Sequence, residues 1–183
     1  MSRSLLGGGS LRLLATFLPD SHAMYEHLAR SVLWDTRIKA RKSMSFGLPY
    51  NYSGIEWPET PFPAALLSLL PRLTAEVGFE PNNCLANYYE SGKSTMGFHS
   101  DSTAELEPHT GIVVLSLGAQ RTITFRRISD KATSESYSLP SGSLLWMSLE
   151  MQSEWLHAIL ADGTATGRIS LTFRRINSTS LSS

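Results

Sequence analysis

The chain has 183 residues, of which 42% are hydrophobic, and its 16 Lys+Arg balance 16 Asp+Glu to give zero net charge. This composition excludes disorder across the chain, and the length suits a single domain that spans residues 1–183. The balanced charge excludes nucleic-acid binding by bulk charge alone, so any polyanion would need a local basic patch. The single cysteine, Cys84, excludes an intramolecular disulfide and a cysteine-based zinc site.

The N-terminal part of the chain carries helical patterns. Residues 20–35 place apolar side chains near helical spacing, and residues 61–77 predict a second helix that Pro71 bends or breaks. We therefore expect residues 11–36 to form a helical support. The apolar start is interrupted by Arg12 and three glycines, which makes it too broken for a signal peptide, and no later run is long enough for a membrane span. We expect a cytoplasmic protein, or a nuclear one in a eukaryote.

The second part of the chain changes to short runs that contain β-branched residues and are separated by turn formers. The runs are residues 84–89, 111–117, 121–127, 134–139, 143–149, 155–160 and 168–176. Such spacing predicts an antiparallel sandwich or jelly roll. The expected fold is mainly β, of the α+β kind. Its β core spans residues 84–176, the N-terminal helices pack on one side, and residues 177–183 form a polar tail.

The stretch GFHSDST, residues 97–103, holds a histidine and an aspartate two positions apart. In a strand or a tight loop, residues i and i+2 point the same way, so His99 and Asp101 can reach one ion. Imidazole and carboxylate together suit iron, manganese or zinc. The pair alone is a weak signal, because this spacing arises by chance in many chains.

A third ligand would strengthen the metal interpretation, and the chain offers four further histidines. His22 and His27 lie in the first predicted helix and are expected to face solvent. His109 lies in a turn close to the pair and remains an alternative. His157 lies in a strand run, where side chains are held more rigidly, so we favour it over His109.

Two histidines and one carboxylate form the facial triad of non-haem iron(II) oxygenases, which leaves positions open for other groups. In the 2-oxoglutarate enzymes the cosubstrate is a dicarboxylate and needs cationic partners. The last run, RISLTFR, places Arg168, Ser170, Thr172 and Arg174 on one strand face. Arginine binds carboxylates through paired, charge-assisted hydrogen bonds. Two arginines facing into a barrel would be costly without an anion.

Five segments in this order resemble the AlkB-type dioxygenases, iron(II)- and 2-oxoglutarate-dependent enzymes that remove alkyl groups from nucleic-acid bases. They are residues 87–103, 114–127, 142–147, 155–157 and 168–174. The resemblance implies a double-stranded β-helix core in which His99, Asp101 and His157 are the catalytic iron ligands. It also implies that 2-oxoglutarate binds Arg168 and Arg174, with further hydrogen bonds from Asn87, Tyr89 and Ser170. Many relatives carry asparagine at the position of Ser170, but serine can still donate and accept a hydrogen bond.

Residues 37–60 are expected to form a substrate-recognition lid. Within it, the stretch YNYSG, residues 50–54, resembles the lid motif of the family, which implies that Tyr52 stacks on a base opposite His99, with Tyr50 nearby. The YNYSG stretch is preceded by four basic residues that could follow a phosphate backbone: Arg37, Lys39, Arg41 and Lys42. The predicted substrate contacts are Tyr52, Tyr50, Arg41, Glu105 and Arg121, of which the last two could instead support the ligands.

Duplex-repairing relatives carry, before this lid, an insert with an apolar wedge that pushes a base out of the helix, and the stretch from Trp34 to Tyr50 is too short to hold it. Single-stranded DNA or RNA is therefore the expected partner, ahead of duplex DNA. The expected function is oxidative dealkylation of N-alkylated bases, as in DNA repair, which consumes O2 and releases aldehyde, succinate and CO2. The alternative is hydroxylation of a small molecule or a protein side chain by the same cofactors. We expect a monomer that makes no contact with membranes.

Overall fold

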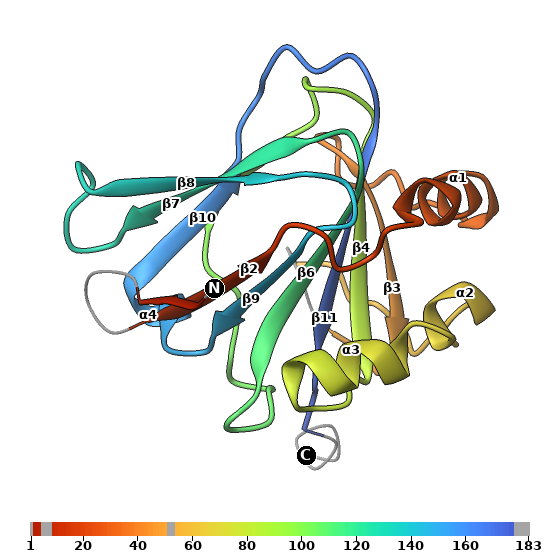
Figure 1. The fold of residues 1–183 in the computed structure, drawn as a ribbon, viewed down its shortest axis with the longest axis horizontal. Helices are drawn as coiled ribbons and strands as arrows, with labels where there is room; N and C mark the ends of the chain where they lie inside the picture. The colour runs from red at the N-terminus through yellow and green to blue at the C-terminus, as the bar shows by residue number, and fades with distance from the viewer. Residues whose placement is uncertain (1, 5–8, 51–53, 178–183) are drawn as a thin grey trace.

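The structure, a computed structural model, describes residues 2–4, 9–50 and 54–177. Two antiparallel sheets form its core (Figure 1). The large sheet contains, in spatial order, β1 (Ser2–Ser4), β2 (Ser10–Leu14), β9 (Leu144–Ser148), β6 (Gly111–Gly118), β11 (Arg168–Arg174), β4 (Asn83–Tyr89) and β3 (Lys42–Gly47). The small sheet contains β5 (Met96–His99), β10 (Trp155–Ile159), β7 (Arg121–Arg127) and β8 (Ser134–Leu139).

From β4 onward the chain crosses repeatedly between the two sheets. Strands β4, β6, β9 and β11 belong to the large sheet, and the strands that fall between them in sequence belong to the small one. This alternation is the double-stranded β-helix, or jelly roll, that the sequence predicts. Each of the seven predicted runs is a strand in the structure. The fold prediction is therefore confirmed.

Three of the described helices lie on the side of the large sheet away from the small sheet (Figure 1). They are α1 (Ser21–Ser31), α2 (Ala64–Leu67) and α3 (Leu70–Val77). Leu28, Leu66 and Leu73 are buried in one apolar cluster with the outer face of the sheet. The predicted second helix is broken, with Pro71 in the first turn of α3, where its missing N–H costs no helical hydrogen bond. None of the helices in the described part of the chain is long and apolar enough to cross a bilayer.

Two of the expected boundaries are corrected by the structure. The helical support expected over residues 11–36 begins with β2, which pairs with β9, and only α1 is helical there. The lid expected over residues 37–60 contains β3, which pairs with β4 along its whole length and so belongs to the large sheet. Both segments extend the large sheet, where β9 and β4 would otherwise lack a strand partner on that side.

The two faces of β11 separate two environments, as its alternation predicts. Ile169, Leu171 and Phe173 face the helices and belong to their apolar cluster. Arg168 and Arg174, with the two hydroxyl residues between them, face the space between the sheets. All seven residues of β11 are buried, so the cationic face lies inside the barrel.

Cys84 lies on β4 and faces the helices, and its side chain is fully buried. Burial in apolar surroundings raises the pKa of the thiol well above its ordinary value, so the reactive thiolate is suppressed. We expect iodoacetamide to leave the native chain unmodified and to add one alkyl group once urea unfolds it, as read by intact-mass spectrometry. Rapid labelling of the native chain would show that the helices do not cover the outer face of β4.

Candidate active site

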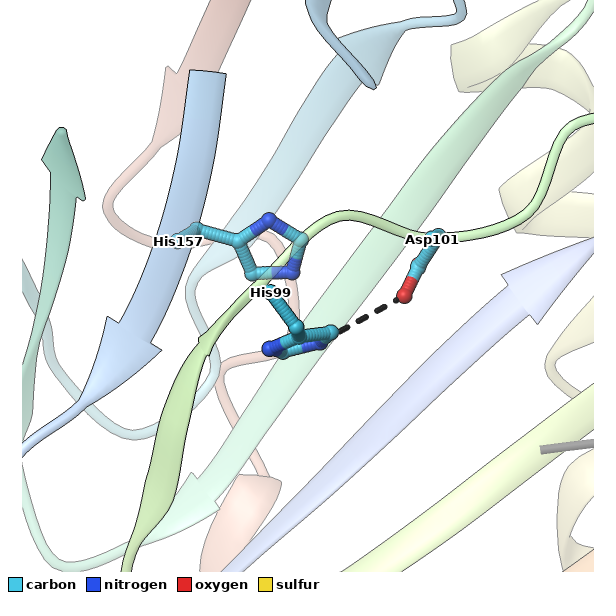
Figure 2. Close-up of side chains that lie close together, drawn as sticks. All are labelled: His99, Asp101 and His157. Carbon is cyan, nitrogen blue, oxygen red and sulfur yellow. Dashed lines mark ion pairs between the residues drawn. The ribbon is translucent and has the colours of Figure 1, made fainter. Parts of the chain in front are cut away.

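Three side chains meet where β5 and β10 pair. His99 ends β5 and lies opposite His157 on β10, and Asp101 follows two residues later in the loop (Figure 2). A nitrogen of each histidine and an oxygen of the aspartate all lie within 4.8 Å of one another. Among the described residues no other group of three such side chains could hold a metal ion. His109, the alternative third ligand, is exposed in a turn and does not belong to this group.

Hydrogen bonds orient the first histidine and the carboxylate for metal binding. The Nδ1 of His99 lies 2.9 Å from the carbonyl oxygen of Gly97, and donation there leaves Nε2 with a lone pair for a metal. That Nε2 lies 3.5 Å from Oδ1 of Asp101. The other carboxylate oxygen, Oδ2, accepts a hydrogen bond of 2.7 Å from Nη2 of Arg174. One oxygen of Asp101 is therefore held by the protein, while the other points toward the histidines.

The electrostatic environment keeps His157 and Asp101 in the protonation states that a metal requires. Burial lowers the pKa of His157 to about 4, so its imidazole is neutral at pH 7. Burial alone would raise the pKa of Asp101, but the Arg174 guanidinium and His99 hold it well below its ordinary range. The donor set is thus the neutral imidazole of His157, the imidazole of His99 and the carboxylate of Asp101, which suits iron(II).

A pocket extends from these residues along the inner faces of β4 and β11, and Arg168 is part of its lining. The Arg168 side chain is 1% exposed and stacks on the ring of Tyr89, with 5.2 Å between its central carbon and the ring centroid. Its Nη2 donates to Ser116 at 2.8 Å, but Nε and Nη1 have no partner among the described residues. Burial lowers the pKa of Arg168 to about 10, which leaves the guanidinium charged at pH 7. A buried, charged and partly unpaired guanidinium fits an anionic ligand.

Asn87 and Ser170, which are paired in register on β4 and β11, also line this pocket. The Oδ1 of Asn87 accepts hydrogen bonds from Arg41 and Ser43, whereas its Nδ2 makes none with a described residue. The pocket therefore presents amide and guanidinium donors along one wall, which fits the two carboxylates of 2-oxoglutarate.

Arg121, a predicted substrate contact, does not line the pocket. The Arg121 side chain is 2% exposed, donates to the carbonyl oxygens of Ser91, Ser94 and Leu160, and lies 2.8 Å from Asp162. It fastens two loops together outside the pocket, so a substrate contact is not supported.

Two further predicted contacts also lie away from the pocket lining. Glu105 does not line the pocket, and its backbone carbonyl accepts from the amide of Asn177. Tyr50 is buried, with its ring centroid 4.4 Å from the guanidinium carbon of Arg174, so it packs against that arginine. Tyr52 lies outside the described residues.

The four basic residues before the YNYSG stretch do not form one continuous basic surface. Arg37 pairs with Asp35 at 2.6 Å and Lys42 with Glu90 at 2.7 Å. Arg41 is buried and turned toward Asn87, and Lys39 is exposed. Alternation along a strand cannot distinguish a solvated arginine from one that reaches into a pocket.

Two polar residues of the site do not stand out in the sequence. Ser116 lies opposite Ser170 on β6 and β11, so the alternation of the run GIVVLSL could have placed it inward. Gln152, in the short helix α4 (Met151–Glu154), accepts from the amide of Asp101 at 2.9 Å and so holds the ligand loop. Nothing in the local pattern around Gln152 signals that contact.

Comparison with known proteins is consistent with this site. The pattern that defines the 2OG-Fe(II) oxygenase superfamily matches residues 16–174. The alpha-ketoglutarate-dependent dioxygenase alkB homolog 3 of Bos taurus is 28% identical over 179 residues, which cover 87% of this chain and 63% of that protein. The human DNA oxidative demethylase ALKBH2 is 30% identical over 138 residues, which cover 71% of this chain and 53% of that protein.

The chain thus spans less than two thirds of the length of these relatives. Among solved structures, that of OsALKBH1 superimposes with a TM-score of 0.62 at 18% identity, covering 90% of this chain and 97% of that one. This likeness confirms the fold. Because the superfamily pattern covers most of the chain and the relatives share one type, the protein belongs to the 2OG-Fe(II) oxygenase superfamily and is of the AlkB type.

Proposed function

We propose that this protein is an iron(II)- and 2-oxoglutarate-dependent dioxygenase that removes alkyl groups from N-alkylated bases in single-stranded DNA or RNA. The observation that carries the proposal is the His-Asp-His group beside a pocket whose wall holds a buried, partly unpaired arginine. The relatives support the substrate class, since one of them is named a DNA oxidative demethylase. DNA repair is the biological role that follows from such chemistry.

In this proposal His99, Asp101 and His157 hold iron(II), and Arg168 with Asn87 binds one carboxylate of the cosubstrate. When bound, iron(II) and 2-oxoglutarate supply the oxidising power that hydroxylates an N-alkyl carbon with O2, so that aldehyde leaves the base while succinate and CO2 form. Arg174 keeps Asp101 ionised and occupies one of its oxygens, which limits the carboxylate to a single metal contact. With three protein ligands, a bound iron(II) would keep other positions for the cosubstrate and O2.

The proposed preference for single-stranded substrates rests on the short segment between Asp35 and β3. Asp35 forms an isolated β-bridge with Ser43 of β3, so residues 36–41 are the whole of the link between Asp35 and that strand. A wedge that could open a duplex does not fit in that link. A base that is already unpaired needs no wedge, and Tyr52 remains the proposed aromatic contact in the lid.

A substrate panel tests the proposed function. We expect methylated single-stranded DNA or RNA to release formaldehyde in step with succinate, because coupled turnover needs an N-methyl carbon at the metal. Methylated duplex DNA should react more slowly and free nucleosides least, as measured by formaldehyde and succinate assays on the iron-loaded protein. Succinate formation without demethylation of any nucleic acid would contradict dealkylation and favour hydroxylation of a small molecule or a protein side chain. The zero net charge and the pairing of Arg37 and Lys42 with acids suit that alternative.

A further inference from the structure

The side chain of Asn87 is held from one side by two donors on the edge of the large sheet. Nε of Arg41 donates to Oδ1 of Asn87 at 3.0 Å, and Oγ of Ser43 donates to the same oxygen at 2.8 Å. Ser43 lies on β3 directly opposite Asn87 on β4. All three side chains are buried, so water does not compete for these hydrogen bonds.

These two bonds fix which way the amide faces. An arginine and a serine hydroxyl donating to one atom require that atom to be the amide oxygen, because the amide nitrogen offers only donors. The Nδ2 group must then point the other way, and Asn87 lines the pocket beside Ser170 and Arg168. Since Nδ2 makes no hydrogen bond with a described residue, its donors are available to a ligand in the pocket.

Arg41 also connects this amide to the strand that carries His99. Its Nη1 donates to the carbonyl oxygen of Thr95 at 3.3 Å, and the amide of Thr95 donates to Ala40 at 3.2 Å. Thr95 directly precedes β5, which ends at His99. One guanidinium therefore bridges the cosubstrate wall and the base of the metal-binding strand.

We propose that Arg41, with Ser43, is a positioning residue of the cosubstrate site, which turns the Nδ2 donors of Asn87 toward an oxygen of 2-oxoglutarate. The inference deepens the proposed function and rests on its cosubstrate. It replaces the phosphate contact expected of Arg41, whose side chain is 8% exposed and engaged inside the protein. Lys39, two residues earlier and exposed, is the cation of this segment that is placed to meet a polyanion.

The test measures binding of 2-oxoglutarate to the full chain loaded with Mn²⁺ in place of iron, by calorimetry and without turnover or nucleic acid. We expect Arg41→Met to raise the dissociation constant about tenfold, the value of one lost charge-assisted hydrogen bond, and Ser43→Ala about threefold. Lys39→Met removes a charge from the same segment and should leave this constant unchanged. Asn87→Asp keeps both donors satisfied but presents an anion to the pocket, so it should weaken binding more than Arg41→Met.

A double-mutant cycle identifies the route of the effect. In an Asn87→Ala background, Arg41→Met should have no further effect on 2-oxoglutarate binding, because the group it positions is gone. An equal effect in both backgrounds would overturn the proposal in favour of a direct field from the guanidinium. Unchanged affinity in both Arg41→Met and Ser43→Ala would overturn it too, and Ser43→Ala decides the matter alone if Arg41→Met does not fold.

The readout separates this inference from the dealkylase proposal, since neither a nucleic acid nor a reaction is needed. Loss of single-stranded DNA affinity in Arg41→Met, with intact 2-oxoglutarate binding, would restore the phosphate contact and sink the positioning role. Weaker 2-oxoglutarate binding in a protein that demethylates no nucleic acid would preserve the positioning role within a different oxygenase.

Discussion

Replacing His157 with alanine is expected to abolish both metal binding and 2-oxoglutarate turnover. The imidazole is buried, neutral at pH 7 and paired in register with His99, and the metal-binding group among the described residues contains no further histidine. Outer-shell partners of metal ligands are already worth about 10- to 100-fold in affinity or activity, so losing a ligand itself should cost more than about a hundredfold. Metal content after gel filtration and succinate formation measure the two effects.

His109→Asn is the matched control for this prediction. His109 is exposed and has a backbone φ of 63°, a conformation that asparagine tolerates, so the substitution removes an imidazole without straining the turn. We expect unchanged metal content and turnover. If His109→Asn removed the metal while His157→Ala kept it, the trio assigned to the metal would be wrong.

Much of the fold could be predicted because the runs from residue 84 onward are short, apolar or alternating, and bounded by turn formers. The sequence of β11 shows the principle most clearly, since its even and odd positions face different environments in the structure. The same alternation explains why two arginines could be placed inside a barrel from the order of residues alone. His157 followed from similar reasoning, because a strand run beside a strand run brings side chains into register.

The missed strand β3 shows where that reasoning stops. Its sequence KSMSFG alternates serine with larger residues, and both serines are buried: Ser43 and Ser45 are each 1% exposed, whereas Lys42 and Met44 are only partly buried. They face the polar pocket wall, where Ser43 bonds to Asn87 and Ser45 to Asn83. A pattern search that expects apolar residues on the inner face therefore reads β3 as a loop. The inward orientation of the Arg41 side chain could not be predicted for the same reason, because its partner in the interior is the polar Asn87.

Two buried arginines of one strand should respond in opposite ways to the same substitution. Arg168 and Arg174 are each 1% exposed, yet Arg174 forms an ion pair with Asp101 at 2.7 Å, whereas Arg168 has no acidic partner among the described residues. Arg174→Met leaves a buried carboxylate without its partner and should lower the free energy of unfolding by about 3–5 kcal/mol. Arg168→Met removes a buried charge that the protein satisfies only in part, and should leave that free energy within about 1 kcal/mol of the parent, or raise it.

The opposite ranking is expected when the cosubstrate is the probe. Truncating one side of a buried, hydrogen-bonded charge pair costs about 2–5 kcal/mol of binding, so Arg168→Met should bind 2-oxoglutarate at least about thirtyfold more weakly despite its intact fold. Urea unfolding of the metal-free chain and calorimetry of the Mn²⁺ form measure the two quantities separately. A stable protein that has lost its cosubstrate would show that Arg168 is kept for an anion and contributes little to folding. If Arg168→Met were instead as unstable as Arg174→Met, the guanidinium would have an internal counter-charge, and the pocket would not be built around a carboxylate at that wall.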